Sequence, residues 1–516
     1  MKMLAPVCIL TAGKGTRMNP LSFMNKALLP FGQKAILSHI IDSFPQGTPF
    51  VIALGYQGAQ VREYLAAAHP HLSVTFVEVD LLEGEGSGPG YSLFCCRKHL
   101  QKPFYFIACD TLFQGNLKDQ PKGNWIGISA VPQSEQNAYC NVQLKESRVV
   151  ALLDKAVTGN QTPAFTGLMF IQDVSLFWSS LAKGKAIAGE HQVSSGLQGL
   201  LQESELQSFP IHWTDLGTYE KYRKAVAETQ LYDFGKTNES LYFVDGRVVK
   251  FFSDPKIVTA RVRKASLKPS IFPKIGYAGS QFYAYPFVPG RTLYTYLSPE
   301  IFSQLLSWLQ TEVWTPVTVA ESDMKRHCHT FYRVKTAERL KAFQKKYPDF
   351  ADPLSVNGIP VRPVSALLNA LPWDELCQGK PVFMHGDLQF DNILYDEKSG
   401  QFTLIDWRQD FAGNVEFGDL YYDLAKLHGG MILNYDYIKQ GLFDFRLEKG
   451  NLHVDFAQRF LGQTYQKQLQ QFVQTAGLDF RRVKQLTGLI YLNMAPLHHP
   501  PFDQALYGLG ALFLSS

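Results

Sequence analysis

The sequence predicts two domains, an α/β domain followed by an α+β domain that becomes mostly helical towards its end. Three observations indicate this organisation. The chain has 516 residues, which is too long for one ordinary hydrophobic core. Up to about residue 230, short apolar runs alternate with amphipathic stretches, as in repeated βαβ units with a mostly parallel sheet. Beyond that point, a hairpin pattern precedes helical periodicity.

The elements of the first domain follow from apolar runs and amphipathic periodicity. Residues 6–10 are expected to form a buried strand that ends in a glycine-rich loop. Further strands are expected at 50–55, 74–79 and 104–109, and helices at 35–44 and 61–68. Because open α/β sheets bind ligands at the carboxyl ends of their strands, the glycine-rich loop lies at the expected binding edge.

The second domain is expected to open with a β-hairpin, because apolar runs at 241–244 and 247–252 flank an Asp-Gly turn. A strand at 281–287 follows, and helices dominate from residue 299. No long Pro/Gly/Ser linker separates the two patterns. We therefore expect domains at 1–231 and 232–516, the second with lobes at about 232–298 and 299–516.

The composition narrows the class of protein. A net charge of +4 and 46% hydrophobic residues are typical of a soluble globular enzyme and give no reason to expect a nucleic-acid partner. No run approaches the ~18 apolar residues that cross a bilayer. Seven scattered cysteines without CxxC spacing argue against a zinc or disulfide framework and favour the cytoplasm. We expect no signal peptide. The sequence does not determine the oligomeric state, and a homo-oligomer is one alternative.

The glycine-rich loop at residues 10–18 (LTAGKGTRM) carries chemistry suited to phosphate. Gly13 and Gly15 let backbone N–H groups approach phosphate oxygens without a Cβ in the way. Arg17 offers a planar set of donors, and Lys26 supplies a second cation. A G-x-G alone also fits an ordinary strand-to-helix turn. The combination with the two cations indicates a site for a nucleoside triphosphate (NTP).

These residues, with KALLP at 26–30, resemble the signature of the sugar-phosphate nucleotidyltransferase family. A strand ending at Asp110 and the segment WTDLGT at 213–218 extend the resemblance over most of residues 4–230. It implies a Rossmann-like α/β fold. The implied site comprises catalytic Arg17 and Lys26, Mg²⁺ ligands Asp110 and Asp215, nucleotide-binding Leu10, Ala12, Gly13, Gly15 and Thr16, and acceptor-binding Lys155 and Gly167.

The chemistry implied for this domain needs no protein nucleophile. An acceptor phosphate attacks the α-phosphorus of an NTP, and pyrophosphate leaves. Negative charge builds on the nonbridging oxygens, so the cations and a Mg²⁺ ion held by Asp110 and Asp215 would stabilise the transition state. For Asp110 alone, a strand-end cap is the competing interpretation.

One segment departs from the family pattern. Residues 83–92 (EGEGSGPGYS) stand where members that act on hexose 1-phosphates carry a Q-x-x-G-T-A-like segment. Gly86 and Gly88 permit close approach to a nucleotide, but the Gln and the Thr-Ala are missing. A carboxylate here would suit the exocyclic amine of cytosine, which makes CTP one candidate NTP. A solvated acidic loop is the alternative.

A second motif follows at residues 385–392 (HGDLQFDN). In kinases, an Asp with an Asn five residues later provides a catalytic base and a metal ligand from one loop. Asp387 would orient the substrate hydroxyl, and Asn392 would bind Mg²⁺. Asp406, at the end of an apolar strand, would be the main Mg²⁺ ligand.

This motif, with the Ile-Asp-Trp variant at 405–407 and GDLYYDLA at 418–425, resembles the aminoglycoside phosphotransferase and choline kinase family. The resemblance implies a bilobal protein-kinase-like fold in which ATP contacts Ser240 and Lys250. One expected partner is missing: between Phe251 and Pro299 the only acidic residue is Asp254, so no glutamate can pair with Lys250. Asp254 or a distal acid substitutes, or the lysine is positioned differently. An exposed strand lysine is the alternative for Lys250.

Acidic and aromatic side chains are dense after Asp406. They would suit a cationic acceptor, because carboxylates and aromatic faces bind quaternary ammonium groups. Core packing is the alternative. The residues concerned are Asp410, Glu416, Asp419, Trp407, Phe411, Phe417, Tyr421 and Tyr422.

Together these observations predict a bifunctional enzyme. Its kinase domain would use ATP to phosphorylate a small hydroxyl compound, and its first domain would join that phosphorylated acceptor to a nucleotide for surface polysaccharide or phospholipid decoration. One alternative is a sugar 1-phosphate nucleotidyltransferase with an anomeric sugar kinase. Others are a single-activity nucleotidyltransferase with a regulatory kinase-like module, and an antibiotic-modifying phosphotransferase with an accessory domain.

Overall fold

The computed structural model describes residues 4–154, 162–187, 189–229, 238–457 and 462–515. Contacts within it divide the chain into two compact units. The first comprises residues 1–230, 237–253 and 279–284, and the second comprises residues 231–236, 254–278 and 285–516. The domain boundary expected near residue 232 stays a prediction, because the first unit also takes in the hairpin that follows it.

A nine-stranded sheet with the order β5-β4-β1-β6-β11-β8-β12-β10-β9 forms the centre of the first unit. β1 (Val7–Leu10), β4 (Phe50–Leu54), β5 (Val74–Glu78) and β6 (Phe104–Ala108) are mutually parallel, at the positions predicted from the apolar runs. β1 and β4 are buried almost throughout, as expected for parallel strands covered on both faces. The glycine-rich loop therefore leaves the interior of the sheet at its carboxyl edge.

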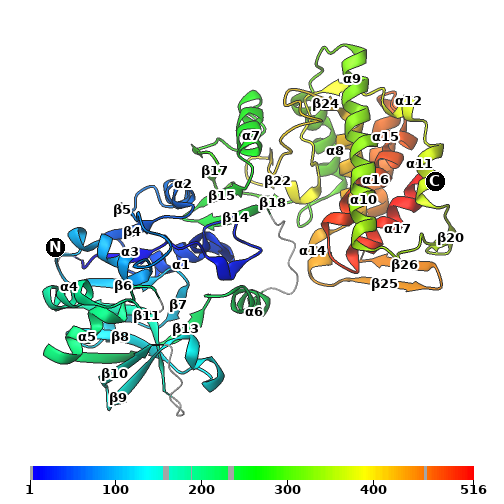
Figure 1. Cartoon of the computed structure of the whole chain (residues 1–516). Coiled ribbons are helices and arrows are strands. Elements are labelled where there is room, and N and C mark those ends of the chain that lie inside the picture. The colour runs from blue at the N-terminus through cyan, green and yellow to red at the C-terminus, as the bar shows by residue number, and fades with distance from the viewer. Residues whose placement is uncertain (1–3, 155–161, 188, 230–237, 458–461, 516) are drawn as a thin grey trace. The chain divides into compact units, whose positions relative to one another are not determined.

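The remainder of the sheet differs from the prediction of a mostly parallel sheet. β11 (Ala164–Ile171) runs antiparallel to β6 and β8, and β10 (Arg148–Asp154) runs antiparallel to β9 and β12. The direct turn between β9 and β10 explains part of this difference, because a short connection joins only antiparallel strands. The other strands are β8 (Asn124–Ser129), β9 (Cys140–Lys145) and β12 (Leu206–Pro210). Figure 1 shows α2 beside the β4–β5 edge and the β9–β10 hairpin at the opposite end.

The helices of the first unit include the two predicted ones, α1 (Ile36–Asp42) and α2 (Gly58–Ala68). A separate antiparallel pair, β7 (Thr111–Gln114) and β13 (His212–Asp215), sets Asp215 opposite Thr111. Because Thr111 follows Asp110 directly, this register brings the two predicted metal ligands together. The remaining helices are α3 (Pro89–Cys95), α4 (Val174–Lys183), α5 (Ser194–Glu203) and α6 (Tyr219–Thr229).

The predicted hairpin is present as β14 (Glu239–Val244) and β15 (Arg247–Phe252), and β17 (Phe282–Pro286) lies beside β15. It packs inside the first unit. The Tyr242 hydroxyl donates to the Leu28 carbonyl at 2.7 Å, and its ring meets Tyr64 of α2 edge-on, with ring centroids 5.1 Å apart. The hairpin is therefore bonded to the segment that follows the glycine-rich loop.

In the second unit, α7 (Pro255–Leu267) is the first helix among the described residues, and the unit is mostly helical. The catalytic-loop motif precedes the hairpin of β22 (Ile393–Asp396) and β23 (Gln401–Leu404), and α13 (Leu420–Ile432) follows. The other helices are α8 (Pro299–Trp308), α11 (Val364–Ala370), α12 (Trp373–Leu376), α14 (Tyr435–Lys439), α15 (Gly462–Thr475), α16 (Phe480–Met494) and α17 (Phe502–Ser515). The other strands are β16 (Tyr277–Ala278), β18 (Arg291–Thr292), β19 (Ser355–Val356), β20 (Ile359–Pro360), β21 (Pro381–Val382), β24 (Gly418–Asp419), β25 (Phe443–Glu448) and β26 (Asn451–Phe456).

One long helical stretch crosses this unit. α9 (Glu321–Cys328) continues through a π-helical segment (His329–Val334) into α10 (Lys335–Lys346), and Figure 1 shows the two helices in line. Short π-helical segments inside longer helices are frequent at functional sites. Among the described residues, none of the helices is both long and apolar enough to cross a membrane.

Candidate functional sites

The glycine-rich loop of the first unit is tied down at its base. Thr11 donates to the Ala53 carbonyl through its N–H at 3.0 Å and its hydroxyl at 2.7 Å. The side-chain amide of Asn25 donates to the carbonyls of Thr11 and Tyr56, both at 2.9 Å. These bonds hold the start of the loop in place while its exposed tip remains open to a ligand.

The tip of the loop has the exposure and the backbone conformation that the predicted phosphate binding would need. Gly15 adopts φ +63°, the left-handed conformation that glycine tolerates best. Gly13, Thr16 and Arg17 are exposed beyond the buried Ala12, with Leu10 half-buried at the end of β1. The backbone N–H groups and the Arg17 guanidinium are therefore available to an anion.

Lys26 and Asp110 form the centre of this site. Lys26 Nζ lies 2.6 Å from Asp110 Oδ2 and also donates to the Gly217 carbonyl at 3.0 Å. Burial alone would raise the pKa of Asp110, but the charges of Lys26 and Arg17 outweigh it and hold that pKa below its ordinary value. Asp110 is therefore kept ionised, as a metal ligand must be.

Asp215 faces the same point as Asp110. A Cβ placed on Gly217 would lie 2.7 Å from Asp215 Oδ1 and 3.6 Å from Asp110 Oδ2. Two carboxylates that converge beside a phosphate loop fit Mg²⁺, which is usually held by one or two carboxylates together with substrate phosphates. Among the described residues, groups of three or more His, Cys, Asp or Glu suited to a metal are absent, so any such ion would depend on the NTP for further ligands.

Two residues of this site were not predicted from the sequence. The Tyr139 hydroxyl donates to Asp215 Oδ2 at 2.6 Å, and Lys221 Nζ contacts the same oxygen at 2.8 Å and Glu135 at 2.7 Å. Burial would lower the pKa of Lys221, but its hydrogen bonds to Asp215 and Glu135 raise that pKa above the ordinary value. The position of Lys221, one helical turn after WTDLGT, was the available signal.

The segment that departs from the hexose-type pattern is an internally bonded loop. Gly86 donates its N–H to the Gly189 carbonyl at 2.9 Å. Gly88 has φ +114°, and a Cβ there would lie 2.9 Å from the His191 carbonyl. Packing against residues 190–191 therefore accounts for Gly88, whereas Gly86 is favoured by its φ of +87°. Glu83 is exposed and pairs with Lys14 at 2.8 Å, which places its carboxylate beside the glycine-rich loop.

The other predicted residues of this unit are spread more widely. Gly167 has φ +83° and approaches the end of β6, where a Cβ would lie 3.0 Å from the Ala108 Cβ. Lys155 lies outside the described residues. Ser240 lies in β14 opposite Phe251, and Lys250 is buried in β15 opposite Leu241. Lys250 is therefore not the exposed strand lysine of the alternative interpretation.

In the second unit, the catalytic-loop motif is held by its own backbone. The Asp387 N–H donates to His385 Nδ1 at 3.2 Å, and His385 Nε2 lies 3.0 Å from the Ile405 carbonyl. The imidazole is therefore neutral with its proton on Nε2, consistent with burial, which lowers its pKa to about 3. This ring joins the catalytic loop to the strand that leads to Asp406.

Asp423 of α13 supports the same loop from behind. It accepts from the His385 N–H at 2.8 Å and the Gly386 N–H at 2.7 Å, and from Trp314 Nε1 at 3.1 Å. Asn392 donates its side-chain N–H to the Asp387 carbonyl at 2.8 Å, which orients the amide oxygen that a metal would use. The predicted base and one predicted metal ligand are thus fixed relative to each other.

Both predicted acidic residues have cationic neighbours. Asp387 lies 2.7 Å from Lys426, a buried lysine of α13, and Asp406 lies 2.6 Å from Arg261 of α7. Asp406 has φ +53°, an uncommon conformation outside glycine that is typical of functional positions. An oxygen of Asp406 and the amide oxygen of Asn392 suit Mg²⁺. A bound Mg²⁺ would either displace Arg261 from Asp406 or share the Asp406 carboxylate with it.

α7, the helix on which a glutamate partner for Lys250 would be expected, carries cations instead. Besides Arg261, Lys264 donates to the Arg408 carbonyl at 2.9 Å, and burial lowers its pKa to about 7. Asp254, the proposed substitute for the missing glutamate, accepts from the Lys256 N–H at 2.9 Å. It therefore caps the start of α7.

The dense aromatic and acidic residues after Asp406 are mostly core. Trp407 and Phe411 are completely buried, and Trp407 donates to the Arg261 carbonyl. Asp419 is buried against Tyr332 and Arg482, and the exposed Glu416 pairs with Arg263. Core packing, the alternative interpretation, therefore accounts for most of these residues, and a cationic acceptor stays a prediction.

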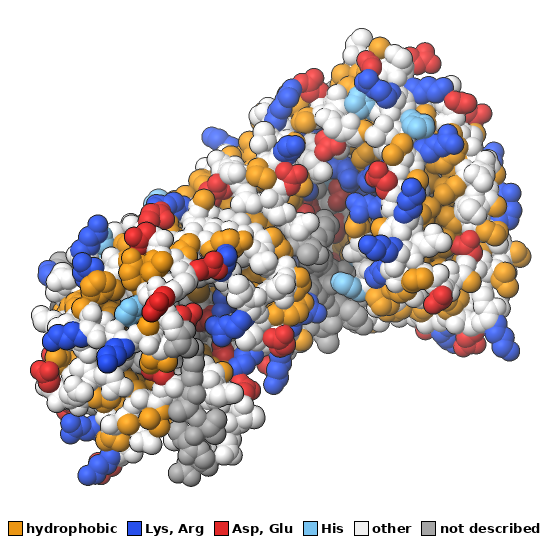
Figure 2. Space-filling view, in the orientation of Figure 1, with side chains coloured by type: hydrophobic (Ala, Val, Ile, Leu, Met, Phe, Trp, Pro, Cys, Tyr) orange, Lys and Arg blue, Asp and Glu red, His pale blue; other side chains and the backbone are white. Residues whose placement is uncertain are grey.

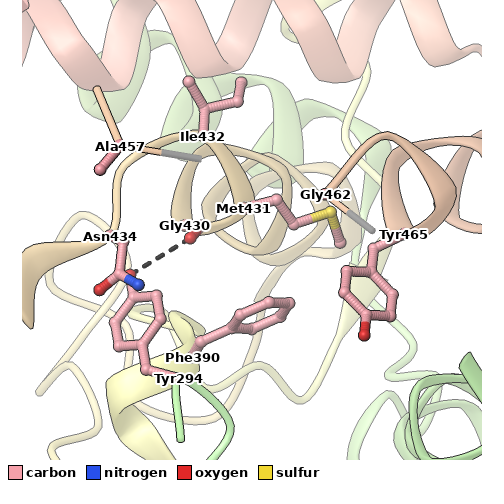
Figure 3. Close-up of a pocket in the computed structure, with 9 residues that line it drawn as sticks. All are labelled: Tyr294, Phe390, Gly430, Met431, Ile432, Asn434, Ala457, Gly462 and Tyr465. Atoms are coloured by element: carbon pink, nitrogen blue, oxygen red, sulfur yellow. Dashed lines mark hydrogen bonds between the residues drawn. The ribbon is translucent and has the colours of Figure 1, made fainter. Parts of the chain in front are cut away.

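A pocket lies behind the catalytic loop, beside Phe390. The close-up in Figure 3 shows the rings of Tyr294 and Phe390 beside each other in its lining, with centroids 5.8 Å apart, and the Tyr294 hydroxyl donates to the Gly430 carbonyl at 3.2 Å. Asn434 Nδ2 is buried there without a hydrogen-bond partner among the described residues. The remaining lining residues are Met431, Ile432, Ala457, Gly462 and Tyr465.

The two sites define a transferase that has one phosphate-handling centre in each unit. Comparison with known families agrees with this division. Residues 7–117 match the MobA-like NTP transferase domain, and residues 272–451 match the phosphotransferase enzyme family. The chain thus fuses an N-terminal nucleotidyltransferase domain to a C-terminal phosphotransferase domain, which confirms both resemblances drawn from the sequence.

Individual relatives match only part of the chain. It is 23% identical over 216 residues to the bifunctional protein GlmU of Methanococcus maripaludis, covering 40% of this chain and 50% of that protein. It is 26% identical over 117 residues to the UTP–glucose-1-phosphate uridylyltransferase AglF of Haloferax volcanii, covering 22% and 46%. The chain thus spans about half the length of these relatives. The solved structure of apo UDP-glucose pyrophosphorylase aligns with a TM-score of 0.39 at 16% identity, covering 44% of this chain and 98% of that one.

Proposed function

We propose that this chain catalyses two consecutive steps. The second unit transfers the γ-phosphoryl group of ATP to a small hydroxyl compound, and the first unit joins the phosphorylated product to a nucleotide with release of pyrophosphate. The observation that carries this proposal is that each unit has its own acidic pair beside cations, Asp110 and Asp215 in one and Asp387 and Asp406 in the other.

In the first unit, the glycine-rich loop and Arg17 would bind the NTP phosphates. Mg²⁺ held by Asp110 and Asp215 would supply charge neutralisation at the α-phosphate when bound. Lys26, already within 2.6 Å of Asp110, would stabilise the charge that develops there as the acceptor phosphate attacks. Lys221 and Tyr139 hold Asp215 from its other side and would fix its orientation towards the metal.

In the second unit, Asp387 would accept or orient the proton of the acceptor hydroxyl. Mg²⁺ held by Asn392 and Asp406 would neutralise the ATP phosphates when bound. Asp423 and His385 would keep the loop in this geometry through the hydrogen bonds they already make. Lys426, 2.7 Å from Asp387, would hold that carboxylate in position.

Within this proposal, the nucleotide is CTP and the product is an activated precursor. CTP is favoured by the absence of the hexose-type segment and by Glu83, an exposed carboxylate beside the glycine-rich loop. The product would then be an activated precursor for surface polysaccharide or phospholipid decoration, made in the cytoplasm. The second candidate is a sugar 1-phosphate pathway, favoured by the similarity to an enzyme named for UTP and glucose 1-phosphate.

Pyrophosphate release measured over four NTPs and a panel of phosphorylated acceptors tests the first step. A matched pair of variants separates the two units: Asp110→Asn should abolish pyrophosphate release and leave ATP consumption intact, and Asp387→Asn should do the reverse. If the wild type releases pyrophosphate but phosphorylates no acceptor with ATP, the two-step proposal is contradicted. The chain would then be a single-activity nucleotidyltransferase with a regulatory kinase-like module.

A further inference from the structure

A group of cations surrounds Lys335 in the second unit, and one of them, Lys426, contacts the predicted base. Lys335 and Arg339 come from α10, Arg408 follows Asp406 by two residues, and Lys426 of α13 contacts Asp387. Figure 2 shows Lys and Arg side chains gathered along the part of this unit where Figure 1 shows α10. None of these cations was singled out from the sequence.

Two of these cations lie over the same aromatic ring, that of Phe331. Lys335 Nζ lies 4.1 Å and Arg408 Cζ 5.0 Å from the centroid of Phe331. That ring belongs to the π-helical segment before α10 and is packed against Phe411 and Tyr422, with centroids 4.4 and 4.9 Å away. Both cations therefore rest on the same buried aromatic platform, which holds them in place without neutralising them.

Cations outnumber acids among the charges that act most strongly on Lys335. They are Arg408, Arg339 and Lys426, and the acid that acts on Lys335 most is Asp410. Of these cations, Lys426 is already paired with Asp387. Asp410 is engaged in a turn, where it accepts from the Gly413 N–H at 2.8 Å. Burial and the neighbouring cations lower the pKa of Lys335 to about 6, and a negative group bound beside it would raise that pKa and restore its charge. Arg408 Nε is buried without a hydrogen-bond partner among the described residues.

We propose that the acceptor of the phosphotransferase unit is an anionic alcohol, a hydroxyl compound carrying a carboxylate or a phosphate, whose negative group binds Lys335, Arg339 and Arg408. This inference rests on the proposed kinase function and names the acceptor class for that site. It replaces the cationic acceptor that the aromatic and acidic residues suggested. A negative group would supply the missing counter-charge beside the base that receives the hydroxyl proton.

In the transfer step, the acceptor oxygen forms a bond to the γ-phosphorus of ATP. The bond from that phosphorus to the β–γ bridging oxygen breaks, so ADP leaves. The hydroxyl proton passes to Asp387. With its negative group held by the cations, the acceptor would present its hydroxyl to that carboxylate.

Binding to the full-length chain tests the acceptor class without requiring turnover. Calorimetry would compare glycerol 3-phosphate, glycerate, glycerol and choline, which differ mainly in charge. We expect glycerol 3-phosphate or glycerate to bind at least tenfold more tightly than glycerol, and choline to bind no better than glycerol. Preference between the first two identifies phosphate or carboxylate as the recognised group. Tighter binding of choline, or equal binding of all four, overturns the proposal.

Variants then assign the anion to these cations. Lys335→Met and Arg339→Met should each weaken binding of the preferred anion about tenfold, the effect of losing one charged hydrogen bond. Lys341→Met, on the exposed face of the same helix, is the matched control and should change nothing. The KM for ATP should stay unchanged in all three. A raised KM for ATP with unchanged acceptor binding would assign the cations to the ATP phosphates and overturn the proposal.

These outcomes remain distinguishable from failure of the kinase function itself. Tight, cation-dependent anion binding without ATP consumption would contradict phosphoryl transfer while supporting an anion site. Phosphorylation of choline in preference to glycerol 3-phosphate would support the kinase and contradict the anionic acceptor. If a variant fails to fold, the wild-type binding series alone still decides the acceptor class.

Discussion

Replacement of Lys26 by Met tests the centre of the nucleotidyltransferase site. The Lys26 side chain is 10% exposed and that of Asp110 24% exposed, and their charged atoms lie 2.6 Å apart. At an effective dielectric constant of about 20, that distance corresponds to a gross attraction of about 6 kcal/mol. The substitution would leave a largely buried carboxylate without its main cation.

The net effects are smaller than the gross attraction, because desolvation opposes it. We expect the free energy of unfolding to fall by about 1–3 kcal/mol, since Asp110 remains partly solvated. We expect kcat for pyrophosphate release to fall about 10²–10³-fold, as for loss of one preorganised electrostatic group. Without Lys26, the pKa of Asp110 rises, so the acid limb of the pH–rate profile moves to higher pH.

Lys34 provides a matched control in the same unit. It pairs with Asp42 at the same 2.6 Å, but the side chains are 34% and 39% exposed. Exposed pairs of this kind contribute about 0–1 kcal/mol, so Lys34→Met should leave both stability and kcat nearly unchanged. Urea unfolding and pyrophosphate release would be measured for both variants. If Lys26→Met retains kcat within threefold, or Lys34→Met loses as much, the assignment of Lys26 is refuted.

Three further substitutions test other parts of the structure. Lys221→Met should lower kcat for pyrophosphate release about tenfold by loosening Asp215, whereas the exposed neighbour Lys224→Met should have no effect in the same assay. Asp423→Asn should destabilise the protein by about 1–3 kcal/mol in urea unfolding and abolish ATP-dependent phosphorylation, with pyrophosphate release unchanged. Gly55→Ala should weaken NTP binding in a fluorescence-displacement titration, because its Cβ would lie 2.6 Å from the Ala12 carbonyl; unchanged affinity would contradict a fixed loop base.

Much of the first site could be predicted because its residues lie at strand ends. Apolar runs predict β1 and β6, and the residues after them, the glycine-rich loop and Asp110, follow from the geometry of parallel strands. Asp215 needed the family pattern, since only the β7–β13 pairing brings it to Asp110. Tyr139 and Lys221 could not be predicted, because their role depends on the folding of distant segments around Asp215.

In the second site, the residues of the loop could be predicted, but the surrounding cations could not. Its loop motif predicts Asp387 and Asn392, and the following strand end predicts Asp406, but composition does not reveal which aromatic side chains are available to an acceptor. The aromatic residues that suggested a cationic ligand are buried, and burial depends on tertiary packing that local composition does not reveal. The cations come from α10, α13 and the residues after Asp406, so they form a group only once these elements pack together.

An anionic acceptor also constrains the first unit. After phosphorylation, such a compound would carry two negative groups, one that attacks the NTP and one that was recognised by the second unit. The first unit would then need a cation for the second group in addition to Arg17 and Lys26, whose charges already act on Asp110. The family resemblance places Lys155 in contact with the acceptor phosphate. If Lys155→Met keeps its affinity for the NTP but binds a doubly anionic acceptor more weakly, both units recognise the same anionic compound. If the variant loses affinity for the NTP and for the acceptor equally, Lys155 does not discriminate acceptors and this link between the units is contradicted.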